Sequence, residues 1–219
     1  MNTGIDRIKS FSFKLILIGL LAAAIVAGAS CGEKEQTTTP APTETLPPGQ
    51  TPTPTPSAPL TTEWAPDGTI SAREYGNAET YGSYEIHWSS DEQYIYVGMK
   101  ARTGGFVAVG FQPGSRMKNA DMVFGFVTDG EVTIYDMFST GDFGPHPPDT
   151  ELGGTFDIVE FGGSEEGGFT TIEFKRALVT GDQYDNPLSS GLTKIIWSYG
   201  GSDSITQRHS TRGYGEIDI

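Results

Sequence analysis

Cysteine and basic residues are both scarce in this 219-residue chain. It has one cysteine, and 14 Lys plus Arg stand against 28 Asp plus Glu, for a formal net charge of −14. A single cysteine excludes an intramolecular disulfide and any zinc or iron–sulfur site that needs several thiolates. The acidic balance excludes a nucleic-acid binder, because neutralising phosphates needs a basic surface. No G-x-S-x-G, H-E-x-x-H or phosphate-binding glycine loop with its lysine occurs either, so we predict a protein that is not an enzyme.

Residues 1–30 have the pattern of a secretory signal peptide. Basic residues precede a short apolar run, 15–29, that ends in small side chains. A membrane-spanning helix needs about 20 apolar residues, which makes an uncleaved anchor the weaker alternative. Cys31 follows Gly28-Ala29-Ser30, which resembles a bacterial lipoprotein box although Gly28 departs from the branched residue usual there. An ordinary signal peptidase that cut after Ala29 would instead leave a free thiol.

The rest of the chain divides into a linker, 31–62, and a folded part, 63–219. The linker alternates Pro with Thr and has almost nothing to bury. It is therefore expected to be an extended, hydrated spacer, or a disordered stub of no particular length. The folded part has the size of one domain. With Cys31 lipidated, we expect this domain to be held at the extracytoplasmic face of the cell membrane.

Residues 63–219 are dominated by two-residue periodicity. The strand-like runs are rich in Val, Ile and aromatic residues and are separated by Gly, Asp, Ser or Pro. Asp129-Gly130 between two of them is a strong hairpin signal. No stretch shows sustained helical periodicity. The pattern predicts eight or nine antiparallel strands in an all-β, immunoglobulin-like sandwich. The runs are 84–88, 94–101, 106–112, 122–128, 132–138, 156–161, 169–175 and 193–199.

Side chains that can bind a metal are few in the folded part. Methionines inside strand patterns are expected to fill the core, but Met117 lies in the loop PGSRMKNAD, where it has no obvious core to enter. His146, in GPHPPD, is a metal ligand or a surface residue with no partner in view. His209 follows the last hydrophobic run, and a surface histidine is the plain alternative. Met117 is likewise either exposed or a ligand.

Several segments together resemble the DOMON domain family. They are GFVAVGFQPGSRMKNADMVFGFV (105–127), TIYDMFSTG (133–141), IEFKRALVTGD (172–182), IIWSYGGSD (195–203) and HSTRGYGEIDI (209–219). The more specific marks are the G-x-x-M-x-x-A-D loop and the terminal H-S-x-R-G. In the haem-binding branch of that family, a loop methionine and a late histidine hold b-type haem, and these positions match Met117 and His209. The resemblance implies a haem b electron carrier that exchanges electrons with a redox partner protein or a small reductant.

Further residues are expected around such a haem. Apolar candidates flank the two ligand loops, although each is equally suited to the sandwich core. Basic residues also bracket the ligands, where they either neutralise haem propionates or remain solvated. The apolar candidates are Phe111, Met122, Phe124, Trp197 and Tyr199, and the basic ones are Arg116, Lys118, Arg208 and Arg212.

A second function remains open from the sequence. Another branch of the sandwich superfamily binds sugars on aromatic platforms, so a carbohydrate- or small-ligand-binding module without haem, with polysaccharide as partner, is the alternative. A structural or adhesive module is a third. The aromatic candidates for a platform are Trp64, Tyr75, Tyr81, Tyr84 and Trp88.

Lipidation of Cys31 is directly testable. Mass spectrometry of the membrane fraction should find Cys31 acylated and at the mature N-terminus. Because the thiol is the acylated atom, Cys31→Ser should move the protein out of that fraction. A soluble protein with an unmodified Cys31 would contradict the prediction.

Overall fold

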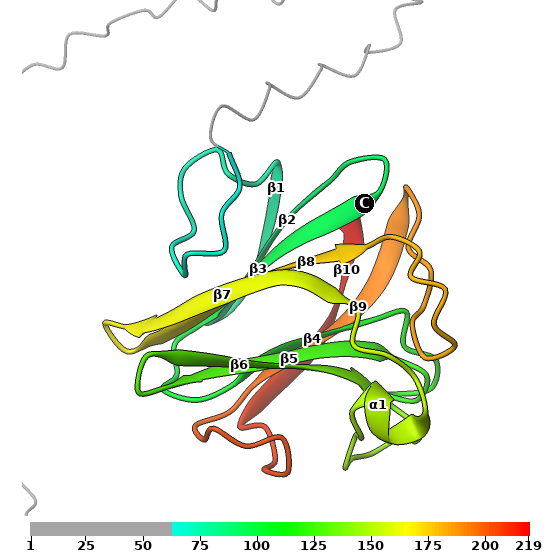
Figure 1. The fold of residues 1–219 in the computed structure, drawn as a ribbon. Coiled ribbons are helices and arrows are strands. Elements are labelled where there is room, and N and C mark those ends of the chain that lie inside the picture. The colour runs from blue at the N-terminus through cyan, green and yellow to red at the C-terminus, as the bar shows by residue number, and fades with distance from the viewer. Residues whose placement is uncertain (1–62) are drawn as a thin grey trace, which may run out of the picture. The chain divides into compact units, whose positions relative to one another are not determined.

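The computed structural model describes residues 63–219, which form ten strands and one short helix (Figure 1). The predicted signal peptide, the predicted lipidation site Cys31 and the predicted linker lie outside the described residues. Within the described part, no helix is both long and apolar enough to cross a membrane.

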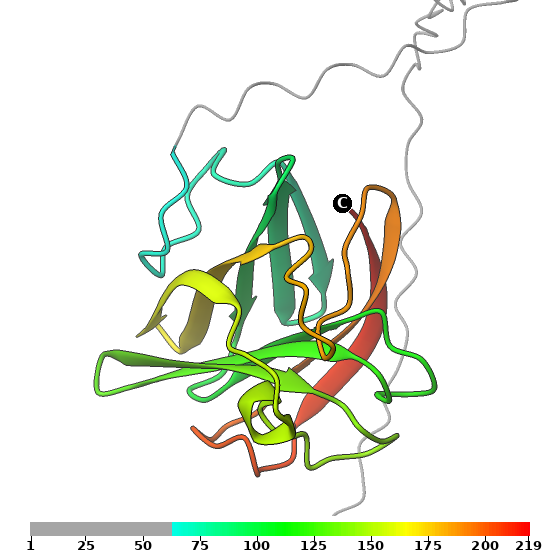
Figure 2. The same ribbon diagram turned by 45° about the vertical axis from the view of Figure 1, so that its right-hand side comes forward.

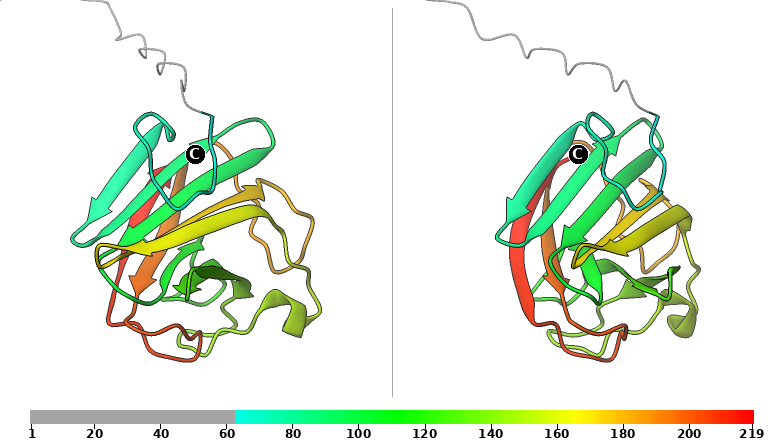
Figure 3. Two further views of the ribbon diagram at one scale, coloured as in Figure 1. Left: turned by 60° about the vertical axis from the view of Figure 1, so that its left-hand side comes forward. Right: turned by 90° about the vertical axis from the view of Figure 1, so that its left-hand side faces the viewer.

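The strands form two five-stranded antiparallel sheets, as predicted from the two-residue periodicity. The first sheet has the order β1-β2-β3-β8-β7 and the second has the order β10-β9-β4-β5-β6. Figure 3 shows the two sheets as the layers of a sandwich. The elements are β1 (Asn77–Tyr81), β2 (Tyr84–Ser90), β3 (Tyr94–Ala101), β4 (Val107–Phe111), β5 (Asp121–Thr128), β6 (Glu131–Phe138), α1 (Asp149–Leu152), β7 (Ile158–Glu166), β8 (Phe169–Ala177), β9 (Leu192–Tyr199) and β10 (Thr211–Asp218).

All eight runs expected from the sequence are strands, but β1 and β10 were not expected as strands. Both pair on one side only, as the edge strands β1 with β2 and β10 with β9. No residue of β1 is buried, and in β10 only Ile217 is buried. Two such strands therefore carry no clear hydrophobic alternation, which is the signal that identified the others.

The core lies between the two sheets. Its residues alternate along each strand, and in β4 they are Val107, Val109 and Phe111. Phe111, expected beside the haem, is 0% exposed and belongs to this core. Of the two alternatives given for Phe111, the structure shows the sandwich core, because Phe111 has the same parity as Val107 and Val109 and its side chain points toward the opposite sheet.

The second sheet is also apolar on its outer face. A separate buried cluster there includes Ala108, Met122, Phe124 and Ile196. A sheet face exposed to water would carry polar residues. Here the segments 139–148 and 200–210 run beneath this face and cover it (Figure 2). This second apolar layer positions the candidate site.

The hairpin between β5 and β6 has the predicted two-residue turn. Asp129 and Gly130 both have positive φ, 52° and 83°. A type I′ turn requires positive φ at both central residues, and the twist of this turn matches the twist of the flanking strands.

Gly130→Ala should therefore lower the free energy of unfolding by about 1–2 kcal/mol, because a Cβ disfavours the left-handed conformation. Urea denaturation measures the change. Gly201→Ala is the matched control, since Gly201 lies in open space without positive φ. Equal losses in the two variants would show that the turn conformation is not the cause.

Candidate functional site

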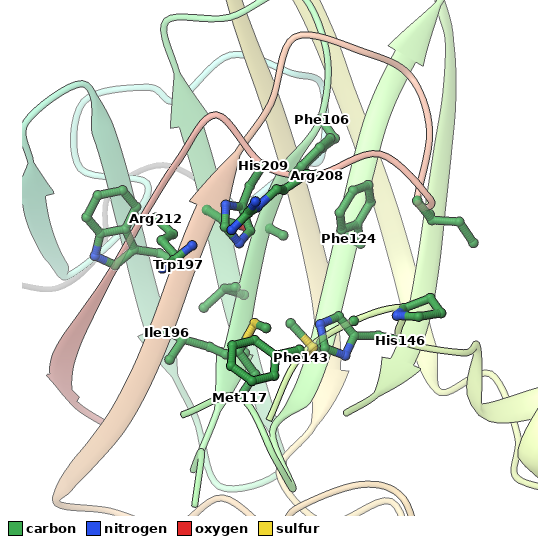
Figure 4. A pocket seen from close by; sticks show the side chains of 18 of the residues that line it. Phe106, Met117, Phe124, Phe143, His146, Ile196, Trp197, Arg208, His209 and Arg212 are labelled. Atoms are coloured by element: carbon green, nitrogen blue, oxygen red, sulfur yellow. The ribbon is translucent and has the colours of Figure 1, made fainter. Parts of the chain in front are cut away.

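A pocket of about 630 Å³ lies on the outer face of the second sheet. Its floor is formed by outward residues of β4, β5 and β9, such as Ala108, Phe124 and Ile196. The segments before β5, after β6 and before β10 form its walls (Figure 4). Gly110 allows Ile196 to pack closely on β4, because a Cβ at residue 110 would lie 2.8 Å from Ile196 Cγ1. The floor is therefore apolar and the walls come from loops.

Met117 reaches the pocket from the loop between β4 and β5. The loop is held by its own backbone, with the Ala120 N–H donating to the Met117 carbonyl at 3.0 Å. It is also tied to the end of β6, because the Asn119 N–H donates to Ser139 O at 2.7 Å and the Ser139 N–H donates to Ala120 O at 2.9 Å. Met117 is half-buried and packs on the outer cluster. It is thus neither a core methionine nor a fully solvated one.

His209 reaches the same pocket from the segment that precedes β10. The next residue, Ser210, is fixed to the end of β9, since its N–H donates to Tyr199 O at 3.0 Å. Burial lowers the pKa of His209, and the positive charges of Arg212 and Arg208 lower it further. A lowered pKa leaves the imidazole neutral at pH 7, the form that binds metals.

The structure brings Met117 and His209 to one pocket although they are distant in sequence. In Figure 4 the two side chains lie at different ends of the pocket, with floor residues between them. The two ligand candidates expected from the sequence therefore line one pocket. The haem itself remains a prediction.

His146 is a further pocket residue, for which the sequence offered no partner. It lies on the same side of the pocket as Met117 in Figure 4. Burial lowers its pKa, and the positive charge of His209 lowers it further. The signal in the sequence was the histidine in GPHPPD. Its location depended on how the loop folds back over the sheet.

Three buried polar atoms in the pocket lining have no hydrogen-bond partner among the described residues. They are His146 Nδ1, Asp142 Oδ1 and Trp197 Nε1. Most buried polar atoms in proteins are paired. These three atoms are exceptions to that rule among the described residues.

Positive charge surrounds the pocket. Arg116, Arg208 and Arg212 line it and are exposed, whereas Lys118 does not line it. The guanidinium of Arg116 lies over the ring of Phe143, 4.7 Å from its centroid, and Phe143 is 65% exposed. Three of the four basic residues expected near the ligands are therefore at the pocket.

The expected apolar contacts are only partly at the pocket. Met122 and Phe124 are in the outer cluster and line it. Trp197 lines it too, but its ring stacks on Tyr84 at 5.1 Å between centroids within the inner core. Tyr199 packs against the inner core and does not line the pocket.

The aromatic residues considered for a sugar platform are engaged inside the fold. Tyr84 and Trp88 are buried, and Trp88 Nε1 donates to Asp218 O at 2.8 Å. Trp64 Nε1 donates to the hydroxyl of Tyr75, which donates to Glu173. Tyr81 stacks on the indole of Trp197. Their placement does not favour an exposed platform.

Comparison with known proteins identifies relatives of the folded part. A family model described as the DOMON domain matches residues 80–200. MOXD1 homolog 1 of Drosophila melanogaster is 31% identical over 146 residues, which cover 64% of this chain and 21% of that protein. DBH-like monooxygenase protein 1 of Mus musculus is 31% identical over 118 residues, 54% of this chain and 18% of that protein. The chain thus spans about a fifth of the length of these relatives.

Two solved structures are also similar. The cytochrome b domain of pyranose dehydrogenase from Coprinopsis cinerea has a TM-score of 0.47 at 16% identity, over 62% of this chain and 75% of that chain. The cytochrome domain of Myriococcum thermophilum cellobiose dehydrogenase has a TM-score of 0.46 at 11% identity, over 62% of this chain and 74% of that chain.

The electrostatics of His209 can be measured in the haem-free protein. Because Arg212 lowers the pKa of His209, Arg212→Gln should raise that pKa toward 6.5, the ordinary histidine value. An NMR titration of the imidazole protons measures the shift. Arg102→Gln, at an exposed arginine outside the pocket lining, is the control. An unchanged His209 pKa in Arg212→Gln would contradict the assignment.

Proposed function

The chain belongs to the DOMON domain family, and from this membership and the pocket geometry we propose that the domain binds haem b between Met117 and His209 and carries electrons. The observation that carries the proposal is the meeting of the two residues in one pocket. By their resemblance to the family's motifs, both residues match the positions that hold haem in its haem-binding branch. Sequence motif and position in the pocket therefore both support Met117 and His209 as the haem ligands.

The pocket fits a flat, largely apolar cofactor with acidic groups. Its volume of about 630 Å³ lies within the range of about 300–1,000 Å³ typical of cofactor sites. The floor is apolar, with Ala108, Phe124 and Ile196 among its residues. Arg116, Arg208 and Arg212 supply positive charge for propionates.

Each ligand residue has a defined role in this proposal. His209 offers a neutral imidazole because its pKa is lowered, and Met117 offers a thioether from a loop that backbone hydrogen bonds hold in place. Haem supplies a one-electron couple when bound, and methionine ligation raises its potential. If Met117 and His209 both held the haem iron, the protein would leave no open coordination position for a substrate. The domain would then be an electron carrier and not an enzyme.

The cellular setting is part of the proposal. Lipidation at Cys31 would anchor the protein at the extracytoplasmic face of the cell membrane, and the 31–62 linker would let the domain reach its partners. The electron donor or acceptor would be a redox partner protein or a small reductant.

The test is the absorbance spectrum of the purified chain with haem, before and after dithionite reduction. The wild type should show the sharp bands of low-spin haem with two axial ligands. His209→Ala should weaken haem binding by roughly tenfold or more, taking the order of effect seen for residues that support metal ligands. Met117→Leu keeps the apolar volume but removes the thioether, and should lower the reduction potential.

His87→Ala is the matched control for the histidine, because His87 lies on β2 outside the pocket lining. A wild-type protein that binds no haem would refute the proposal. If haem binds and both Met117→Leu and His209→Ala keep the spectrum and reduction potential of the wild type, residues other than Met117 and His209 hold the iron.

A further inference from the structure

Exposed apolar side chains are concentrated at one edge of the first sheet. Of the seven large hydrophobic side chains that are exposed in residues 63–219, three lie within six positions of one another, namely Phe156 (45% exposed), Val159 (53%) and Phe161 (41%). The rings of Phe156 and Phe161 meet edge to face, with centroids 6.3 Å apart. These three side chains, called the β7 patch below, lie in β7 or just before it.

The strand that carries the patch is paired on one side only. β7 is the last strand of its sheet and lies against β6, the edge strand of the other sheet (Figure 1). Among the described residues, 158–166 form backbone–backbone hydrogen bonds with β8 and with no other segment. The register shifts once, between Ile158 and Glu160, and is regular over 160–166. The second edge of this stretch is therefore open to pairing with another strand.

Side chains on β7 alternate between the two faces of the sheet. Phe161 lies opposite Phe174, which belongs to the core, so Phe161 points to the inner face. Glu160 lies opposite Lys175 and accepts a hydrogen bond from its Nζ at 2.9 Å. A strand added beside β7 would alternate in the same way. Its inward side chains would meet Phe161 and should therefore be apolar.

The same strand carries negative charge that the domain does not neutralise. β7 contains three glutamates, all exposed, and no lysine or arginine. Glu160 pairs with Lys175, whereas Glu165 and Glu166 form no ion pair within 63–219. Charge complementarity at interfaces favours partners of opposite sign. A strand that pairs with β7 should therefore be basic.

The charge of β7 disfavours two other occupants of its edge. A second copy of the chain, paired through its own β7, would bring glutamates of both strands together, and like charges that face each other across a ladder are destabilising. The segment 31–62 is also a poor match, because it is rich in proline, which lacks the N–H that a ladder needs, and because its charged residues are mainly acidic, Glu33, Lys34, Glu35 and Glu44.

We propose that the open edge of β7 and the β7 patch dock an extended segment of a partner protein in which basic and apolar residues alternate. In strand addition of this kind, main-chain hydrogen bonds give affinity and alternate side chains give specificity. Apolar side chains of the segment would cover Phe161, and basic ones would meet Glu165 and Glu166. The surface shares no residue with the pocket lining, so it stands or falls independently of haem.

An NMR titration of the purified full chain tests the surface. The probe is a nine-residue peptide of alternating lysine and valine. It should shift the amide signals of residues 156–166 and slow hydrogen exchange of the β7 amides that are not bonded to β8. The same peptide with N-methyl groups on alternate residues keeps its charge and side chains but loses backbone donors, so it should bind at least tenfold more weakly. A peptide with glutamate in place of lysine should not bind.

Variants of the patch test its apolar part. Phe161→Thr keeps a side chain suited to a strand but removes the ring, and should weaken peptide binding roughly three- to tenfold. Phe143→Thr is the matched control, at a phenylalanine that is 65% exposed outside the patch. Val159→Ser is the second variant, in case Phe161→Thr does not fold. Its control is Val179→Ser, at a valine that is 66% exposed elsewhere.

A double variant tests the charge. Glu165→Gln with Glu166→Gln should weaken binding and reduce its dependence on salt, because two charges that attract the lysines are lost. Glu92→Gln, at an exposed glutamate outside β7, is the control.

Four results would overturn the proposal. Absence of shifts in 156–166 on adding the lysine–valine peptide would remove the surface. Equal binding of the N-methylated peptide would show attraction of charge without strand addition. Unchanged binding in the double glutamine variant would refute a basic partner. Protection of the β7 amides that increases with protein concentration, in the absence of peptide, would make a second copy the occupant.

Discussion

The functional pocket depends on a sheet that is apolar on both of its faces. Along β4 and β5, odd positions such as Val109 and Val123 pack toward the opposite sheet, while even positions such as Ala108 and Phe124 form a second cluster outside. An apolar outer face of this kind is stabilised when other segments of the chain cover it and exclude water from it. The loops that cover it do not fill it, and the space left is the pocket.

Covering this face joins residues that the chain keeps far apart. Met117 belongs to the loop before β5, His146 to the segment after β6 and His209 to the segment before β10. Each of these loops is tied by backbone hydrogen bonds to a strand end, as Asn119 is to Ser139 and Ser210 is to Tyr199. The donor atoms are thus placed by rigid elements, which suits a site that must hold a ligand in a fixed orientation.

The interior between the two sheets also contains buried charged side chains. Arg176 of β8 crosses to Asp121 of β5, and this ion pair is fully buried. Two further buried aspartates, Asp136 and Asp185, each have a carboxylate oxygen within 4.8 Å of one of Asp121, and the three carboxylates exceed what one guanidinium can neutralise. A sandwich interior does not keep such an excess of negative charge for stability, because apolar residues would pack there at less cost. Burial of this excess raises the pKa of Asp121 and that of Asp136.

The sequence by itself determined the layers, because period-2 alternation is a local property that each strand carries within a few residues. It also singled out Met117 and His209, whose types are rare in loops of this chain and whose motifs match a family. The face to which Phe111 points, the place of His146 at the pocket and the strands β1 and β10 were decided only by the tertiary structure. Parity relative to the core depends on where each strand starts in the sheet. Loop contacts, and edge pairing with few buried side chains, depend on which distant segments meet, and no local pattern records that.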